Sequence, residues 1–162
     1  MKAGVDADHR WRDIRAFESF LRRSIPLVEH LGFSELRFDG RRFEIDALLA
    51  PNHNDKGTAF AGSLSGGANL CGWSLITLLL ADEPPPYDVV IRAGRQEYLL
   101  PVTRDFTLVG QLPEGSDLAT FMQRLRERGK ARLDLVVEVH EGEQLCFRHS
   151  AAYVALKRKQ WV

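Results

Sequence analysis

Hydrophobic residues recur at helical spacing near the start of the chain. Between Trp11 and His30 they lie three or four positions apart, as on one face of an amphipathic helix. These residues are Trp11, Ile14, Phe17, Leu21, Ile25 and Val28. Pro26 lacks a backbone N–H and interrupts the pattern after Ser24. The pattern predicts two short helices, or one kinked helix, ending at Gly32.

Six later stretches alternate hydrophobic and polar residues with the period of two that strands have. They are residues 36–38, 41–49, 87–100, 105–112, 132–140 and 144–156. Asp39-Gly40 and residues 141–143 have the composition of hairpin turns. Gly94 predicts a bulge in the third stretch. Between the fourth and fifth stretches, Ser116 predicts the cap of a short helix that Gly129 ends.

A polar loop and a long apolar segment occupy the centre of the chain. The loop, residues 51–62, is rich in asparagine and glycine. From Ser63 to Ala81 the apolar residues cover most of a helical wheel, which predicts a buried helix with Ser63 as its N-cap. The acidic and proline-rich run at 82–86 ends it. Polar residues within the segment, among them Asn69, argue against insertion into a membrane.

This order of elements leaves few ways to bury the apolar helix. Six mostly antiparallel strands, with the helix between the second and third, must form a sheet that curls around it. The order matches the hotdog fold, so the sequence predicts an α+β protein with one hotdog domain over residues 1–162 and a disordered tail at 1–10. The fold resemblance implies that the open sheet edge pairs with a second subunit, giving a homodimer or higher homo-oligomer. It also implies active sites at the dimer interface.

Charge and composition narrow the classes of partner. With 22 basic and 22 acidic residues, no net charge attracts the chain to nucleic acid or to a membrane surface. An acidic partner would need a local patch, and Arg124, Arg126, Arg128 and Lys130 form one such group or simply a solvated helix face. His140 and His149 lack a third residue at metal-ligand spacing, so no metal site is expected.

The cysteines and the first residues bear on where the protein works. Cys71 and Cys146 are too few for a disulfide framework, so we expect buried free thiols, as in a reducing compartment. The first ten residues contain no apolar signal-peptide core. We therefore expect a cytoplasmic protein.

Residues 54–62 resemble the active-site stretch of hotdog thioesterases. The pattern there is Asn, two residues, Gly, two residues, then His-Gly-Gly at the start of the helix. Asn54, Gly57 and Gly62 match this pattern, Phe60 replaces the histidine, and Ala61 replaces the first glycine of the pair. Those thioesterases often have an acidic residue nine positions after the histidine, where this chain has Asn69. A neutral amide cannot act as that general base or nucleophile.

Residues 49–64, with Gly72 and Trp73 downstream, are similar to a narrower family. Its members are bacterial hotdog domains, long labelled thioesterases and also found behind an acetyltransferase domain, that act as malonyl-ACP decarboxylases. The resemblance implies conversion of malonyl-ACP to acetyl-ACP at the start of fatty acid synthesis. It also implies a malonyl thioester on acyl carrier protein or coenzyme A as the substrate, and no cofactor.

Decarboxylation suits these residues chemically. Loss of carbon dioxide from a malonyl thioester leaves an enolate, which hydrogen-bond donors stabilise without a charged base. Asn54 and Asn52 are the candidate catalytic amides, and which of the two points into the site stays open. The backbone N–H groups at the positive end of the helix are further donors. The candidate substrate-binding residues are Phe60, Ala61, Gly62, Ser63 and Asn69.

Two other functions remain open. An acyl-CoA or acyl-ACP thioesterase would use Asp55 or His53 to activate water. A non-catalytic acyl-binding hotdog dimer would explain the missing acidic residue on the helix.

Overall fold

The computed structural model describes residue 11 and residues 13–158. The predicted tail at residues 1–10 lies outside this part of the chain. Helix α1 covers Ile14–Ser24, and its N-cap Asp13 accepts a hydrogen bond from the Ala16 N–H at 2.9 Å. The short 3-10 helix η1 follows at Pro26–His30. The predicted break at Pro26 is therefore confirmed.

The strands form one six-stranded antiparallel sheet in the order β1-β2-β4-β5-β6-β3. Their bounds are β1 Phe33–Phe38, β2 Arg42–Ala47, β3 Tyr87–Tyr98, β4 Phe106–Gln111, β5 Lys130–Glu141 and β6 Gln144–Lys157. Both predicted hairpins, β1 with β2 and β5 with β6, are present. Strand β3 lies at one edge, because it reaches the sheet only through β6.

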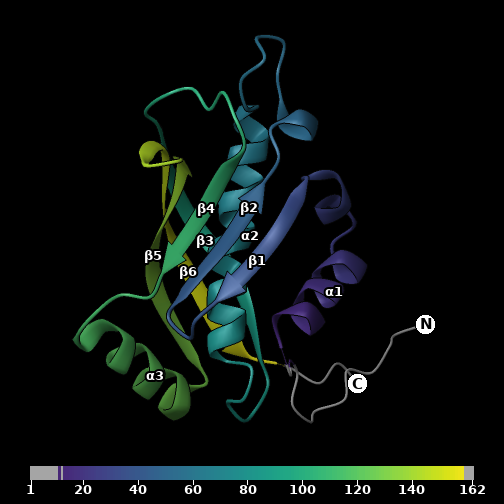
Figure 1. Cartoon of the computed structure of the whole chain (residues 1–162). Helices are drawn as coiled ribbons and strands as arrows, with labels where there is room; N and C mark the ends of the chain where they lie inside the picture. Colours follow the sequence, from purple (N-terminus) through teal and green to yellow (C-terminus); the bar gives the residue numbers. More distant parts are fainter. Residues whose placement is uncertain (1–10, 12, 159–162) are drawn as a thin grey trace.

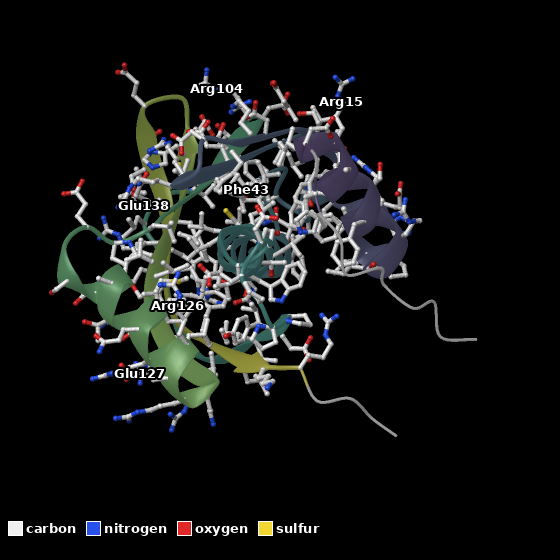
Figure 2. All side chains as sticks on the ribbon, turned by 90° about the horizontal axis from the view of Figure 1, so that it is seen from below. Arg15, Phe43, Arg104, Arg126, Glu127 and Glu138 are labelled. Carbon is white, nitrogen blue, oxygen red and sulfur yellow. The ribbon has the colours of Figure 1, made fainter. Side chains whose placement is uncertain are left out.

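Helix α2, Ala61–Leu79, runs along the inside of the curled sheet (Figure 1). Seen from below, it lies in the middle of the packed side chains, and the fully buried Phe43 of β2 is among them (Figure 2). The residues of α2 that have no exposed surface are Ala68, Cys71, Ser74, Leu75 and Ile76. The α+β class and the hotdog arrangement are confirmed.

Several local predictions are wrong in detail. The central helix covers 61–79 rather than 63–81, and its N-cap is Phe60, which makes no side-chain capping bond, rather than Ser63. The bulge in β3 falls between Ile91 and Ala93 rather than at Gly94, which pairs regularly with Ala151. Helix α3, Ser116–Arg128, is capped by Gly115 instead of Ser116, and ends at Gly129 as predicted. The helix ends differ from the predicted ones by only one or two residues, which is the usual uncertainty of helix boundaries.

Three further features of the fold concern membrane insertion, the cysteines and the unpaired edge of the sheet. No helix in residues 13–158 is long and apolar enough to cross a membrane. Both cysteines are free and buried, as expected. The outer edge of β3 has no strand partner among the described residues, and Val90 and Ile91 on it are 48% and 43% exposed.

Candidate active site

Asn52 joins the loop before α2 to the end of η1. The residue ends a second 3-10 helix, η2 at Ala50–Asn52, and is only 2% exposed. Its Nδ2 donates to the carbonyl oxygens of Leu31 and Leu48, both at 2.8 Å. Both amide hydrogens are thereby used inside the protein. In this conformation Asn52 has no donor left for a substrate oxygen.

Asn54 organises the outer turn of the same loop, which extends beyond the start of α2 (Figure 1). Its Oδ1 accepts from the backbone N–H groups of Lys56 and Thr58 at 2.8 and 3.2 Å. Its Nδ2 donates to Thr58 Oγ1 at 3.0 Å and lies 3.5 Å from the Ala59 carbonyl oxygen. A contact of 3.5 Å is at the outer limit of hydrogen bonding. Asn54 therefore keeps one weakly engaged amide hydrogen, on a half-buried side chain.

The first turn of α2 offers two open backbone donors. The N–H groups of Ser63 and Leu64 both donate to the Phe60 carbonyl, at 3.0 and 3.2 Å, so the predicted donor Ser63 is already engaged. Those of Ala61 and Gly62 make no backbone hydrogen bond in the described structure, as is usual for the first residues of a helix. The helix dipole adds partial positive charge at the same place.

Phe60 occupies the position of the missing histidine and covers the first turn. A Cβ on Gly62 would lie 2.3 Å from the Phe60 ring, so the ring rests directly on this glycine. Phe60 remains 55% exposed. An apolar ring here supplies shape and shields the helix end, but it cannot transfer a proton.

The loop is braced from the opposite side by the segment after β3. The Ala59 N–H donates to the Val102 carbonyl at 2.8 Å. The next residues are held by the buried Glu141, which accepts from the Thr103 N–H at 2.6 Å and from Arg104 Nε at 3.0 Å. These hydrogen bonds, led by the one from Thr103, lower the pKa of Glu141. Glu141 thus holds the segment on which the loop rests.

One stripe of α2 faces β3 and β6, and the sequence interpretation missed most of its partners. The stripe consists of Ala61, Ser65, Asn69 and Trp73, one turn apart. The Tyr98 hydroxyl donates to the Ala61 carbonyl at 3.4 Å, and Gln96 Nε2 donates to Ser65 Oγ. Farther along, the Tyr153 hydroxyl donates to the Asn69 carbonyl at 3.2 Å, and Trp73 Nε1 to the Val89 carbonyl at 2.8 Å. The spacing of four residues is enough to identify the stripe in the sequence. Its hydrogen-bond partners could not be identified in that way, because they depend on the order of the strands in the sheet.

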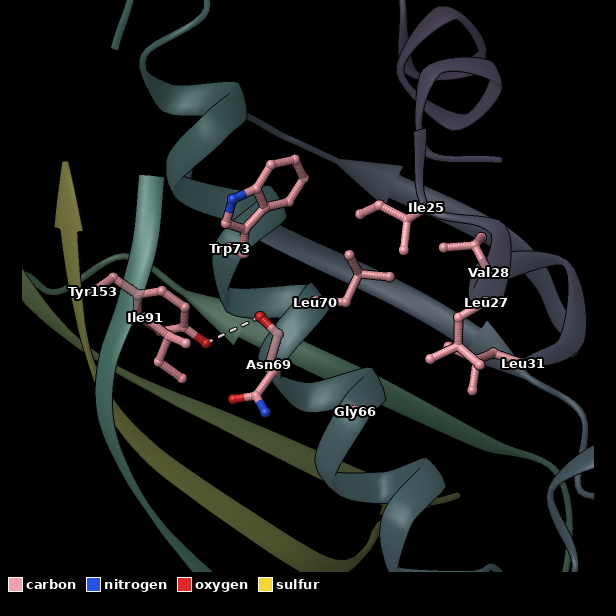
Figure 3. Close-up of a pocket in the computed structure, with 10 residues that line it drawn as sticks. All are labelled: Ile25, Leu27, Val28, Leu31, Gly66, Asn69, Leu70, Trp73, Ile91 and Tyr153. Carbon is pink, nitrogen blue, oxygen red and sulfur yellow. Dashed lines mark hydrogen bonds between the residues drawn. The ribbon is translucent and has the colours of Figure 1, made fainter. Parts of the chain in front are cut away.

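A cavity of about 290 Å³ begins at the second turn of α2 (Figure 3). On one side the cavity is bounded by α2, the end of α1 and η1. On the other side it is bounded by Ile91 and Tyr153. None of the described residues that line it has an acidic or basic side chain. Burial raises the pKa of the Tyr153 hydroxyl, which stays protonated. The main polar side chain of the wall is Asn69, whose Oδ1 is buried without a hydrogen-bond partner.

The candidates for hydrolysis lie away from this cavity. The Asp55 carboxylate is 79% exposed and pairs with Lys56 Nζ at 2.9 Å. His53 is exposed, and its backbone forms a bridge with Ala59. Neither residue lines the cavity.

The basic group on α3 lies far from the loop. Arg126 pairs with Glu83, just beyond the C-terminal end of α2, whereas the loop precedes its N-terminal end. Figure 1 shows α3 at the lower end of the molecule. A carrier protein bound to α3 would therefore dock at the end of α2 opposite to Asn54.

Comparison with known proteins identifies similar chains. The family model described as "Putative thioesterase (yiiD_Cterm)" matches residues 14–157. A protein of unknown function from Chlorobaculum tepidum is 27% identical, with a TM-score of 0.77 over 89% of this chain and 94% of that one. A "putative thioesterase" from Shewanella oneidensis is 28% identical, with a TM-score of 0.75 over 88% and 96%. A Haemophilus influenzae thioesterase, 16% identical with a TM-score of 0.70 over 92% and 94%, shares the fold.

Proposed function

This chain belongs to the YiiD_C hotdog family, and on that premise we propose that it is an enzyme that decarboxylates a malonyl thioester. Action on an acyl thioester follows from the family, whose description and relatives name thioesterases. The choice of decarboxylation is supported by one observation. The loop and the start of α2 supply amide donors, and the apolar cavity that begins at the second turn of α2 has no acidic or basic side chain among the described residues of its wall.

The reaction needs donors at the thioester oxygen. As the bond between the carboxylate and the α-carbon breaks, its electron pair moves into the thioester and places negative charge on the carbonyl oxygen. Asn54 Nδ2 and the N–H groups of Ala61 and Gly62 donate to that oxygen. A single such donor is typically worth about 2.7–4 kcal/mol of barrier. A proton from water then converts the enolate into the acetyl product.

The apolar wall favours the same step. A malonyl carboxylate is most stable when water or a cation solvates it, and its departure as neutral carbon dioxide removes that charge. A cation would stabilise the starting carboxylate more than the transition state and so slow the reaction. A wall without a cation does not have this effect. Lys56 does not alter this, because its ammonium group is paired with Asp55 on the exposed side of the loop.

Hydrolysis of an acyl thioester is the second candidate, and the comparisons favour it over decarboxylation, because the family description and the Shewanella relative both carry the name thioesterase. In that reaction Asp55 or His53 would activate water. The Asp55 carboxylate is exposed and paired with Lys56, so it is not held in a pocket as a general base would be, and this supports the decarboxylase.

The same proposal includes the carrier of the substrate and the oligomeric state of the protein. The thioester is carried by acyl carrier protein or by coenzyme A, which share a phosphopantetheine arm. The exposed apolar edge of β3 supports pairing with a second copy of the chain, as a homodimer or higher homo-oligomer.

The test separates the two reactions by their products. Purified protein is incubated with malonyl-ACP and, in parallel, with malonyl-CoA and butyryl-CoA, while released carbon dioxide and free thiol are both measured. We expect carbon dioxide without thiol from a malonyl substrate. Free thiol from butyryl-CoA, without carbon dioxide from either malonyl thioester, would contradict the proposal and establish hydrolysis. Tight binding of all substrates without turnover would contradict it in favour of an acyl-binding protein.

A further inference from the structure

Three polar side chains connect strand β3 to the first two turns of α2. Gln96 and Tyr98 lie two residues apart on β3, so their side chains point to the same face of the sheet. The Tyr98 hydroxyl donates to Gln96 Oε1 at 3.1 Å and lies 3.4 Å from the Ala61 carbonyl oxygen. Gln96 Nε2 donates to Ser65 Oγ at 2.5 Å. The three side chains therefore form one hydrogen-bonded chain beside the helix end where the thioester is expected.

The direction of these hydrogen bonds leaves one hydrogen for a ligand. A tyrosine hydroxyl has a single hydrogen, and that of Tyr98 is directed at Gln96 Oε1, so the other atom of the amide, Nε2, faces Ser65. Ser65 Oγ accepts from Gln96 and keeps its own hydrogen. The Ser65 hydroxyl donates to no residue in the part of the chain that the structure describes. It is therefore free to donate to a bound acyl group.

Ser65 lies close enough to the first turn to contact the same acyl group. It follows Gly62 by three residues, which is an axial rise of about 4.5 Å. Helical side chains lean toward the N-terminal end, so the hydroxyl is directed back toward the open N–H groups of Ala61 and Gly62. The thioester oxygen and a carboxylate oxygen of a malonyl group are four bonds apart, and three bonds between consecutive Cα atoms already span about 3.8 Å. One malonyl group can therefore reach both places.

The next residue leaves space for the carboxylate beside Ser65. A Cβ added to Gly66 would meet no atom within 4 Å. Gly66 also belongs to the wall of the apolar cavity, in which no described residue has an acidic or basic side chain. Ser65 is half-buried and lies along α2 between the exposed first turn and this cavity. A carboxylate at this point meets a neutral donor.

We propose that the Ser65 hydroxyl hydrogen-bonds the terminal carboxylate of the malonyl thioester, and that Gln96 and Tyr98 position this hydroxyl. The inference rests on the proposed function, since it assigns a place to the carboxylate lost in that reaction. Asn54 and the start of α2 hold the thioester oxygen, and Ser65 holds the other end of the acyl group. A hydrogen bond from a neutral donor is weaker than one from a lysine or arginine, so it orients the carboxylate and still lets it leave as carbon dioxide.

The positioning role follows from how Tyr98 is held. Its ring packs edge-on against the fully buried Phe147 of β6, with ring centroids 5.0 Å apart. This contact fixes the Tyr98 hydroxyl, which in turn selects the orientation of the Gln96 amide. Gln96 and Tyr98 thus act on the substrate through Ser65.

The experiment uses two thioether ligands that cannot react. S-(2-carboxyethyl)-CoA and S-propyl-CoA have chains of the same length and differ only in a terminal carboxylate or methyl group. Both are also transferred to acyl carrier protein, so that either carrier can be used. Calorimetry measures the dissociation constants for the wild-type protein, Ser65→Ala and Gln96→Met. We expect the wild type to prefer the carboxylate ligand about fivefold and both variants to show a preference below about twofold, because a donor to a charged group is lost or misdirected.

Two further variants separate recognition from folding. Ser65→Thr keeps the hydroxyl and is expected to retain a preference of at least about threefold. Ser74→Ala removes a buried hydroxyl from another face of α2 and is expected to keep the wild-type preference. A loss of stability alone changes the affinity for both ligands equally and leaves their ratio unchanged.

The inference and the proposed function can fail separately. Equal affinity of the wild type for the two ligands, absence of binding on either carrier, or an unchanged preference in Ser65→Ala would overturn the role of Ser65, even in a protein that releases carbon dioxide. Because neither ligand contains a thioester, the expected preferences in a protein that releases no carbon dioxide would support the contact with Ser65 and refute only the decarboxylase.

Discussion

The inner and outer parts of the loop before α2 each contain an asparagine, and the two are used differently. Asn52 is buried and places both amide hydrogens on carbonyl oxygens of the scaffold at 2.8 Å. Asn54 closes the exposed turn and keeps one hydrogen in a contact of 3.5 Å. Residue type does not distinguish a catalytic amide from a structural one. What distinguishes them is the number of amide hydrogens that are not used in hydrogen bonds within the protein. Substitutions in the inner part of the loop should therefore mainly change stability, and substitutions in the outer part should mainly change activity.

The largest expected effect is on catalysis at Asn54. Asn54→Ala should lower kcat/KM for the malonyl thioester by about 10²–10³, because one oxyanion donor is lost. Its free energy of unfolding should fall by only about 1 kcal/mol, since the turn is partly solvated. Steady-state kinetics and urea unfolding on the same preparation measure both quantities. A loss of activity below fivefold would remove Asn54 from the mechanism.

Asn52→Ala should show the opposite behaviour. The substitution leaves the Leu31 and Leu48 carbonyls without their donor, and we expect a loss of about 2–4 kcal/mol of unfolding free energy, seen in urea unfolding. Asn52→Asp is the matched control, because it keeps the shape and removes the donors, and it should be at least as destabilising. If Asn52→Ala were as stable as the wild type and yet inactive, Asn52 would be the catalytic amide and Asn54 the structural one.

Glu141 provides a pH-dependent test of the scaffold under the loop. Its pKa is lower in the folded protein than the ordinary 4.5, so its contribution to stability is complete above that value and is lost as the pH falls through the folded pKa. Glu141→Gln should therefore be less stable than the wild type at pH 7 and lose less stability on acidification. Unfolding free energies measured from about pH 7 down to pH 3 would show the two curves converging. Parallel curves would mean that Glu141 does not brace the segment.

The smallest effect is expected at the exposed tip of the loop. Asp55→Asn and His53→Ala should each change decarboxylation by less than about twofold, because both side chains are exposed and exposed pairs contribute little. The measurement is the initial rate of carbon dioxide release. A tenfold loss in either variant would instead indicate a general base and favour hydrolysis.

The fold was predictable because its signals are periodic. The alternation in the strands, the break at Pro26 and the turn at Gly129 required only local physical chemistry. The start of α2 was misplaced because Ser63 is a good cap in isolation, whereas the Phe60 carbonyl accepts from both Ser63 and Leu64 in the folded protein. The bulge was misassigned because Gly94 serves to accommodate His149, a need that exists only once β3 and β6 are paired.

The candidate site was only partly accessible from the sequence. The loop, Asn54 and the start of α2 could be proposed as the site because their spacing resembles a known pattern. The engagement of Asn52 with Leu31, and of Ser65 with Gln96, joins residues 21 and 31 positions apart in the sequence. His149 looked like an isolated strand histidine, and its nearly complete burial could not be read from the sequence.

The most direct test of the central claim is the mass left on the phosphopantetheine arm of malonyl-ACP after incubation with wild type, Asn54→Ala and Asp55→Asn. The account predicts acetyl-ACP with wild type and Asp55→Asn, and unchanged malonyl-ACP with Asn54→Ala. Unloaded carrier protein with wild type and Asn54→Ala, but not with Asp55→Asn, would contradict it and identify a thioesterase with Asp55 as its base.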